Sequence, residues 1–204
     1  GQVLYASQVP LANEMGAVNV IYDPVARIAE AREHGLYTIT RIVTFEDNVW
    51  SHSGDAAIVG NWIDARDEEN WAYPIALAVE ACELGFDEVQ FDYVRFPAGT
   101  TGGQLNRREG LTEEIRVGAI ESFLETARAA INPLGCAVSA DVFAITMSAE
   151  NDQGIGQRPE ELSPHLDAIS PMIYPSHYGD GWLGFSDPNE HNAEVTADAL
   201  DDGA

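Results

Sequence analysis

Lysine is missing from this sequence, and basic residues of any kind are scarce. The ten basic residues are all arginines, against 34 Asp and Glu residues, and the formal net charge is −24 at pH 7. Because a chain this negative repels phosphates, the composition argues against a nucleic acid or an anionic membrane surface as partner. The acidic residues are spread along the chain rather than gathered in a tail, which indicates a solvated acidic surface.

The sequence also has few cysteines and histidines, the residues that bind zinc most often or form a covalent bridge. Its two cysteines, Cys82 and Cys136, have no Cys-x-x-Cys or Cys/His metal spacing. We interpret both as small buried apolar residues, and leave a disulfide between them open. The histidines form no His-x-His or His-Glu-x-x-His motif, so we expect no metal site. No apolar run approaches the roughly 18 residues of a membrane-spanning helix.

Strand-like and helix-like segments alternate along the chain, which is typical of parallel α/β folds. Strands are expected in four stretches rich in β-branched and aromatic residues: 36–45, 86–96, 137–145 and 168–174. Start and stop signals predict three main helices: from Asp23-Pro24 to His34-Gly35, up to Leu84-Gly85, and from Thr112 to Asn132-Pro133. Loops are expected over 46–66, 97–110 and 146–158. The tail ends in what is expected to be the start of another helix.

Two architectures fit this alternation, a doubly wound sheet and a (β/α)₈ barrel. No Gly-x-Gly-x-x-Gly or phosphate-binding Gly-rich loop follows any predicted strand, which weakens the case for a nucleotide-binding sheet. The long loops all follow the carboxyl ends of strands, where the active sites of barrels lie. The pattern therefore favours the barrel.

Two aspartates stand near the ends of otherwise apolar strands. Because side chains alternate between the two faces of a strand, Asp92 lies on one face, and Phe91 and Tyr93 on the other, where they would pack under helices. Asp141 lies at the equivalent depth of the next predicted strand. An Asp in such a strand is costly unless it is paired or functional, so the pattern predicts a polar cluster facing a pocket.

Arginines offer a structural alternative to catalysis. Arg41 lies on the first predicted strand and Arg95 follows Asp92 closely. Either arginine could form a buried ion pair with one of the aspartates, in which case the carboxylates would be structural. We interpret Arg41 as a positioning or pairing residue rather than a reactive one.

Aromatic residues in the predicted loops are candidates for sugar stacking or for the core. Trp71 is near a helix start and is expected in the core. Trp182 lies among glycines after a strand end, which favours stacking on a ligand. Tyr174 ends the fourth predicted strand and is expected to hydrogen-bond at the floor of the pocket.

Four blocks of the sequence together resemble the bacterial "putative glycosyl hydrolase domain" family, and they cover nearly the whole chain in order. The blocks are YTITRIVTF (37–45), GFDEVQFDYVRFP (85–97), SADVF (139–143) and ISPMIYPSHY (169–178). The sequence departs from the family pattern after Trp62-Ile63-Asp64, where Ala65 replaces the usual proline.

The resemblance implies an α/β fold of the (β/α)₈ TIM-barrel type, related to α-galactosidase- and α-amylase-like glycosidases. Against the family pattern, the four strands are barrel strands three to six, so residues 1–204 are expected to form one partial barrel domain, truncated at both ends. Asp92 then ends strand four, where related retaining enzymes carry the nucleophile. Asp141 ends strand five, a position suited to an acid/base, although a carboxylate from another strand is an alternative. The resemblance also points to an extracellular or cell-envelope location.

The leading hypothesis is a glycoside hydrolase acting on a poly- or oligosaccharide, with Asp92 as nucleophile or stabiliser and Asp141 as candidate acid/base. Arg41, Arg95 and Tyr174 would orient the site, and the sugar would be bound by His177, Tyr178 and Trp182, with no cofactor. Since fold does not determine function, a non-catalytic carbohydrate-binding or envelope-associated module on the same barrel is a second hypothesis. A metal-dependent hydrolase is a third.

Overall fold

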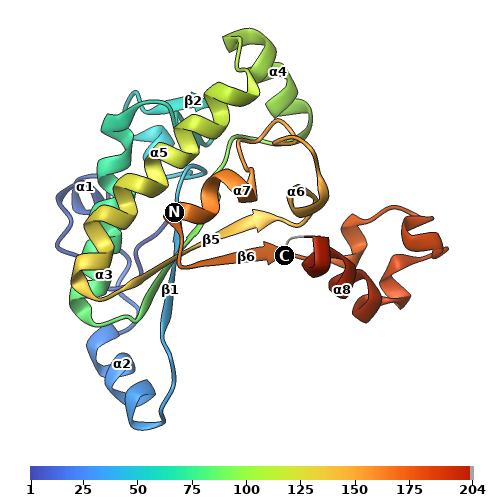
Figure 1. Cartoon of the computed structure of the whole chain (residues 1–204). Coiled ribbons are helices and arrows are strands. Elements are labelled where there is room, and N and C mark those ends of the chain that lie inside the picture. The colour runs from blue at the N-terminus through green and yellow to red at the C-terminus, as the bar shows by residue number, and fades with distance from the viewer. Residues whose placement is uncertain (203–204) are drawn as a thin grey trace.

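A computed structural model describes residues 1–202 of the chain. Its central sheet has four parallel strands in the order β1-β4-β5-β6 (Figure 1). These are β1 (Ile39–Val43), β4 (Glu88–Asp92), β5 (Ala137–Phe143) and β6 (Ala168–Met172). They are the four strands expected from the sequence, each somewhat shorter than expected. Strands that follow one another along the chain are neighbours in the sheet, so their carboxyl ends meet at one edge.

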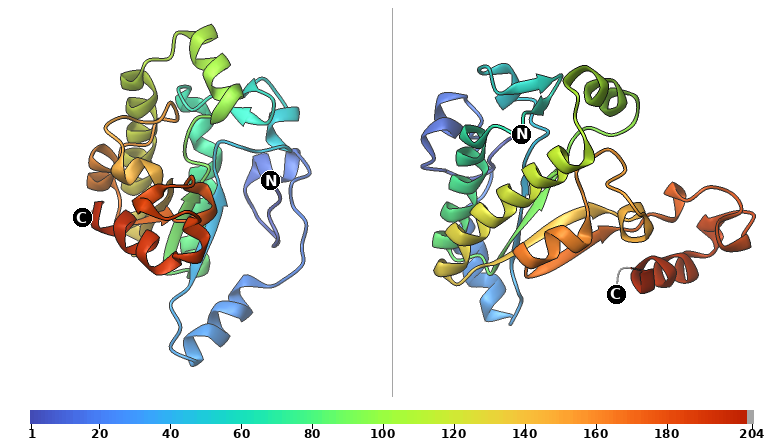
Figure 2. Two further views of the ribbon diagram at one scale, coloured as in Figure 1. Left: turned by 90° about the vertical axis from the view of Figure 1, so that its right-hand side faces the viewer. Right: turned by 45° about the horizontal axis from the view of Figure 1, so that its top comes forward.

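Two long helices, α3 (Ala72–Leu84) and α5 (Glu113–Ile131), lie side by side across one face of the sheet (Figures 1 and 2). The stop signal of α3 and the start signal of α5 are where the sequence predicted them. Gly85 ends α3 in a left-handed conformation, and at the start of α5 the Thr112 hydroxyl accepts a hydrogen bond from the Ile115 N–H. The centre of the core beneath them is aromatic. Phe123 packs edge-on against Phe91 and Trp71, so the expected core position of Trp71 is confirmed.

The remaining helices are shorter. They are α1 (Pro10–Glu14), α2 (Pro24–Glu33), α4 (Gly99–Glu109), α6 (Ile145–Ser148), α7 (Pro159–Leu162) and α8 (Asn192–Asp202). The segment from residue 175 through α8 extends beyond the carboxyl end of β6, on the side away from α3 and α5 (Figure 1). It has a small core of its own, in which Val195 and Ala199 of α8 pack against Ala144 and Tyr178. Within residues 1–202 no helix is long and apolar enough to cross a membrane.

All three expected loops contain regular structure, and in 146–158 this is the short helix α6. The segment 97–110 was expected to be irregular because of its glycines, but it forms α4, which ends at Gly110 with a φ of 64°. Packing overrides propensity here: Gly102 is buried, and a Cβ at this position would lie 1.8 Å from the carbonyl oxygen of Pro97. In the loop 46–66, two short antiparallel strands form a hairpin: β2 (Ala57–Val59) and β3 (Trp62–Ile63).

The two cysteines form a disulfide, which corrects their interpretation as separate apolar residues. Cys82 of α3 is bonded to Cys136, which immediately precedes β5, with a Cα–Cα distance of 5.8 Å. Both residues are buried, as expected. Their pairing was hidden in the sequence because 54 positions separate them, and only the packing of α3 against the sheet brings them together.

Candidate active site

The carboxyl ends of β4 and β5 place two buried aspartates next to each other. In the register of these strands Phe91 pairs with Ala140, so Asp92 and Asp141 are the next residues of adjacent strands. They are only 5% and 8% exposed. The register of β4 and β5 therefore places Asp92 and Asp141 at the equivalent depth that the sequence predicted.

One arginine from β1 contacts both carboxylates. Nη2 of Arg41 pairs with Oδ2 of Asp92, and Nε of Arg41 lies 4.0 Å from Oδ2 of Asp141. The second carboxylate oxygen of Asp92 accepts a 2.6 Å hydrogen bond from the main-chain N–H of Tyr93. The ion pair considered in the sequence thus exists, but it is not sealed in the core, because the Arg41 side chain is 52% exposed.

A pocket of about 580 Å³ opens over these strand ends. Six of the eight residues expected at the site line it: Arg41, Asp92, Arg95, Tyr174, His177 and Tyr178. Asp141 lies beside it, against Arg41, with its side chain 11% exposed. The volume is within the range of pockets that bind small molecules.

Trp182 does not reach this pocket, although its loop position favoured stacking on a ligand. Its ring packs against the ring of Tyr178, with centroids 5.0 Å apart, in the small core that holds α8. The loop after β6 packs against α8 through apolar side chains, and Trp182 is one of the residues that pack against this small core. The expected role of a ligand platform is not supported by this placement.

Tyr93 lies where strand alternation did not predict it. Instead of packing under the helices it lines the pocket, because its φ of 52° turns the chain out of the strand directly after Asp92. Its ring lies 6.1 Å from that of Trp62 in the hairpin β2–β3. Phe143 and Met172 also line the pocket and were missed. Phe143 could have been found, since it is two residues beyond Asp141 and so shares its face of β5.

Arg95 is buried in an aromatic cage at the wall of the pocket. Its guanidinium carbon lies 4.7, 5.2 and 4.4 Å from the ring centroids of Trp62, Tyr93 and Phe143. The residue is 8% exposed, and burial lowers the pKa of the guanidinium. One of its N–H groups donates a 3.0 Å hydrogen bond to the carbonyl oxygen of Phe96.

The environment of Asp141 favours its protonated form. Burial is the largest effect and raises the pKa of this carboxyl, and the negative charge of Asp92 raises it further. A hydrogen bond from Ser170 and the charge of Arg41 act in the opposite direction, but the pKa stays above the ordinary value of 3.8. A carboxyl group of this kind keeps its proton to higher pH than an ordinary Asp side chain, which suits a general acid.

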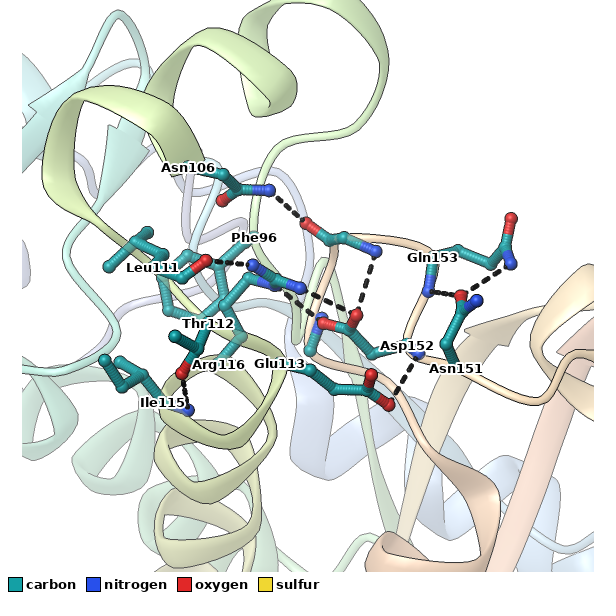
Figure 3. A network of polar contacts seen from close by, with 12 residues as sticks. Phe96, Asn106, Leu111, Thr112, Glu113, Ile115, Arg116, Asn151, Asp152 and Gln153 are labelled. Atoms are coloured by element: carbon teal, nitrogen blue, oxygen red, sulfur yellow. Dashed lines mark hydrogen bonds and ion pairs between the residues drawn. The ribbon is translucent and has the colours of Figure 1, made fainter.

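A second group of buried polar residues holds the loop after β5 in place. Arg116 of α5 forms a two-pronged ion pair with Asp152, with N–O distances of 2.6 and 2.7 Å (Figure 3). The same carboxylate accepts hydrogen bonds from the N–H groups of Gly154 and Gly156. Gly156 has a φ of 82°, and a Cβ there would lie 2.9 Å from the carbonyl oxygen of Arg116. The loop therefore requires glycine at this position to approach α5.

This loop carries Gln157, which is fully buried and bonds to the backbone near the ends of β4 and β5. Its amide nitrogen donates to the carbonyl oxygens of Val94 and Asp141, and its amide oxygen accepts from the N–H of Phe143. Gln157 thus bridges the ends of β4 and β5. No sequence signal distinguished it, because a glutamine in a predicted loop is normally exposed.

Comparisons with known proteins agree with this fold. A family model described as "Putative glycosyl hydrolase domain" matches residues 1–204. A hypothetical protein from Ruminiclostridium thermocellum ATCC 27405 is 33% identical, with a TM-score of 0.54 over 70% of this chain and 77% of that one. No curated protein matches the chain.

More distant structural neighbours are carbohydrate-active domains. The PgaB (BpsB) glycoside hydrolase domain from Bordetella bronchiseptica has a TM-score of 0.56 at 11% identity, covering 90% of this chain and 63% of that one. Catalytic domain 2 of the Ostrinia furnacalis Group II chitinase has a TM-score of 0.52 at 17% identity, covering 88% and 45%. This chain thus spans less than two thirds of either domain. At these identities the likeness shows the fold alone, and it confirms the predicted (β/α)₈ barrel architecture, of which the four parallel strands are a part.

Proposed function

Because this chain belongs to the "Putative glycosyl hydrolase domain" family, we propose that it hydrolyses glycosidic bonds of a poly- or oligosaccharide at the pocket over β4 and β5. One observation carries the proposal: two buried aspartates on adjacent strand ends meet a single arginine at a pocket of about 580 Å³. Glycoside cleavage needs two carboxyl groups, one to protonate the leaving oxygen and one to act at the anomeric carbon or on a water molecule.

Asp92 is assigned the role of nucleophile or charge stabiliser. It lines the pocket, and its two oxygens are held by the Arg41 guanidinium and by the Tyr93 N–H. These two donors fix the carboxylate in one orientation and support negative charge on it. The positive charge that develops at the anomeric carbon in the transition state would be stabilised by this carboxylate.

Asp141 is assigned the role of general acid/base. Because its pKa is raised, this carboxyl group keeps a proton that it can donate to the leaving oxygen. Its side chain is partly accessible beside Arg41. Loss of that proton at high pH would remove the acid and slow the reaction. The alkaline limb of the pH dependence of kcat/KM should therefore depend on Asp141.

The proposal is tested by release of reducing ends from a panel of neutral and acidic polysaccharides, with wild type, Asp92→Asn and Asp141→Asn. We expect Asp92→Asn to lower kcat at least about a thousandfold, because the reaction loses one of two groups that act together. Asp141→Asn should lower kcat and flatten the alkaline limb. The control is Asp55→Asn, which removes the same charge from an exposed position outside the pocket.

Unchanged turnover in Asp92→Asn would refute its assignment. Wild type that binds oligosaccharides but releases no reducing ends from any substrate would instead favour a non-catalytic carbohydrate-binding module. Circular dichroism of each variant separates loss of chemistry from loss of fold.

A further inference from the structure

We propose that the sugar bound in this pocket is acidic, and that Arg95 recognises its carboxylate. The ligand class is that of the uronic acids. This inference rests on the proposed function, because it takes the pocket over β4 and β5 to be a sugar site. It goes further by assigning a substrate class and the residue that selects it.

The first argument is charge. Arg95 is 8% exposed, and among residues 1–202 no carboxylate oxygen lies within 4.0 Å of its guanidinium nitrogens. A buried charge is costly unless it is paired and hydrogen-bonded. Asp92 and Glu46 are near enough to influence Arg95, but neither forms an ion pair with it. The pocket wall therefore holds a cation whose counter-ion the described part of the chain does not supply.

The second argument comes from comparison with Arg41, the other arginine of the pocket. Arg41 forms an ion pair with Asp92, so its charge is already balanced by one carboxylate of the site. Arg95 has no ion-pair partner of this kind in the part of the chain that the structure describes. An anionic ligand would gain little binding energy from Arg41 and much from Arg95. Arg41 therefore orients the aspartates, and Arg95 is the arginine available to bind the ligand.

The third argument is geometric. The rings of Trp62, Tyr93 and Phe143 surround the guanidinium and hold it in place, so little side-chain freedom remains to be lost on binding. Within the described residues, its only hydrogen bond runs from Nη1 to the carbonyl oxygen of Phe96. A guanidinium has five N–H donors, and its planar fork matches a carboxylate in a two-pronged arrangement.

The overall charge of the molecule does not contradict an acidic ligand. The net charge of −24 repels anions at long range, but at physiological ionic strength such repulsion is screened beyond about 8 Å. Contact with a partly desolvated guanidinium is screened much less. Binding should therefore be measured at roughly 0.15 M salt, where the local contact dominates.

The experiment measures the affinity of oligogalacturonate and of an oligosaccharide of glucuronic acid, each against its own methyl ester. The ester has the same skeleton without the charge. Titration calorimetry is performed on the Asp141→Asn protein, in which hydrolysis is expected to be slow and the ion pair between Arg41 and Asp92 is kept. We expect the acid to bind about tenfold or more tightly than its ester for at least one of the two pairs, as expected for hydrogen bonds to a charged group.

Three further variants in the same background locate the preference. Arg95→Met keeps an apolar chain inside the aromatic cage and should reduce the preference to near one. Arg95→Lys keeps the charge but not the planar fork of donors, and its preference for the acid should lie between those of Arg95 and Arg95→Met. Arg27→Met removes a charge from an exposed pair with Glu30 and should leave the preference unchanged.

Equal affinity for acid and ester in both pairs, or no binding of either acid, would overturn the inference. So would an acid preference that survives Arg95→Met in protein with an unchanged circular dichroism spectrum. Hydrolysis of a neutral polysaccharide by wild type without an acid preference would refute acidic recognition and leave the proposed function standing. An acid preference that depends on Arg95, in a wild type that hydrolyses nothing, would support acidic recognition and refute the proposed hydrolysis.

Discussion

The buried amide of Gln157 donates a 3.0 Å hydrogen bond to the main-chain carbonyl oxygen of Asp141. The same side chain bonds to the backbone of Val94, beyond the end of β4, and of Phe143, at the end of β5. One side chain therefore links the chain just beyond β4 to the end of β5, next to the candidate catalytic carboxylates. Gln157 is a positioning residue, since it contacts these strands through their backbones.

Gln157→Leu should lower both stability and turnover. The substitution leaves a buried N–H and two carbonyl groups without their partner, which costs about 2 kcal/mol or more of unfolding free energy. Turnover should fall with KM nearly unchanged, because the carboxylates shift while the pocket wall remains. Urea denaturation and steady-state kinetics test both. Gln153→Asn, an exposed change in the same loop at a φ of 51° that Asn tolerates, is the control and should alter neither.

Arg116→Met should be strongly destabilising. Arg116 and Asp152 are 6% and 2% exposed, and removing one partner leaves an unpaired buried charge, at a cost of about 3–5 kcal/mol. The exposed pair of Arg27 and Glu30 provides the comparison, and Arg27→Met should cost less than about 1 kcal/mol. Denaturant titration of the two variants measures the difference. Equal losses would show that the buried network in Figure 3 does not stabilise the loop after β5.

Asp141→Asn should be more stable than wild type at neutral pH. Because burial raises the pKa of Asp141 above 3.8 in the folded state, the unfolded chain releases this proton at lower pH than the folded chain. Wild type therefore loses stability relative to the variant as pH rises from about 3.8 through the folded pKa, and the gap is constant above it. Melting temperatures of both proteins between acidic and neutral pH test this. Parallel curves would contradict the raised pKa.

The disulfide should contribute strongly to stability. A cross-link between residues 54 positions apart restricts the unfolded chain by about 4 kcal/mol in the chain-entropy model. We expect the double variant Cys82→Ser, Cys136→Ser to lose about this amount of unfolding free energy, measured in urea. Dithiothreitol should lower the stability of wild type to that of the variant and leave the variant unchanged. Insensitivity of wild type to the reductant would argue against the bond.

Much of the scaffold could be predicted from the sequence because its signals are local. The Thr112 cap and the Gly85 stop depend only on adjacent residues, and the structure has both where they were expected. The four strands could be identified by their composition. Asp92 and Asp141 could be placed at one depth because a strand has a fixed alternation and the chain order determined which strands are neighbours.

Other features could not be predicted from the sequence because they depend on contacts between distant segments. Tyr93 was assigned to the wrong face, since one left-handed residue ends the alternation on which the prediction relied. The glycines of α4 suggested a loop, but close packing of Gly102 allows a helix. Trp182 had the position of a ligand platform, and the packing of α8 placed it in a separate core.

The sequence by itself determined the order of the four sheet strands and of the main helices, the acidic composition and the two aspartates at the carboxyl edge of the sheet. These follow from side-chain periodicity and capping, which act over a few residues. The tertiary structure alone decided that Cys82 and Cys136 are bonded, that Gln157 joins β4 to β5, and that Arg95 lies among three rings with no ion-pair partner among residues 1–202. Each of these depends on side chains that meet only when the sheet and its helices pack, and no local pattern encodes such a meeting.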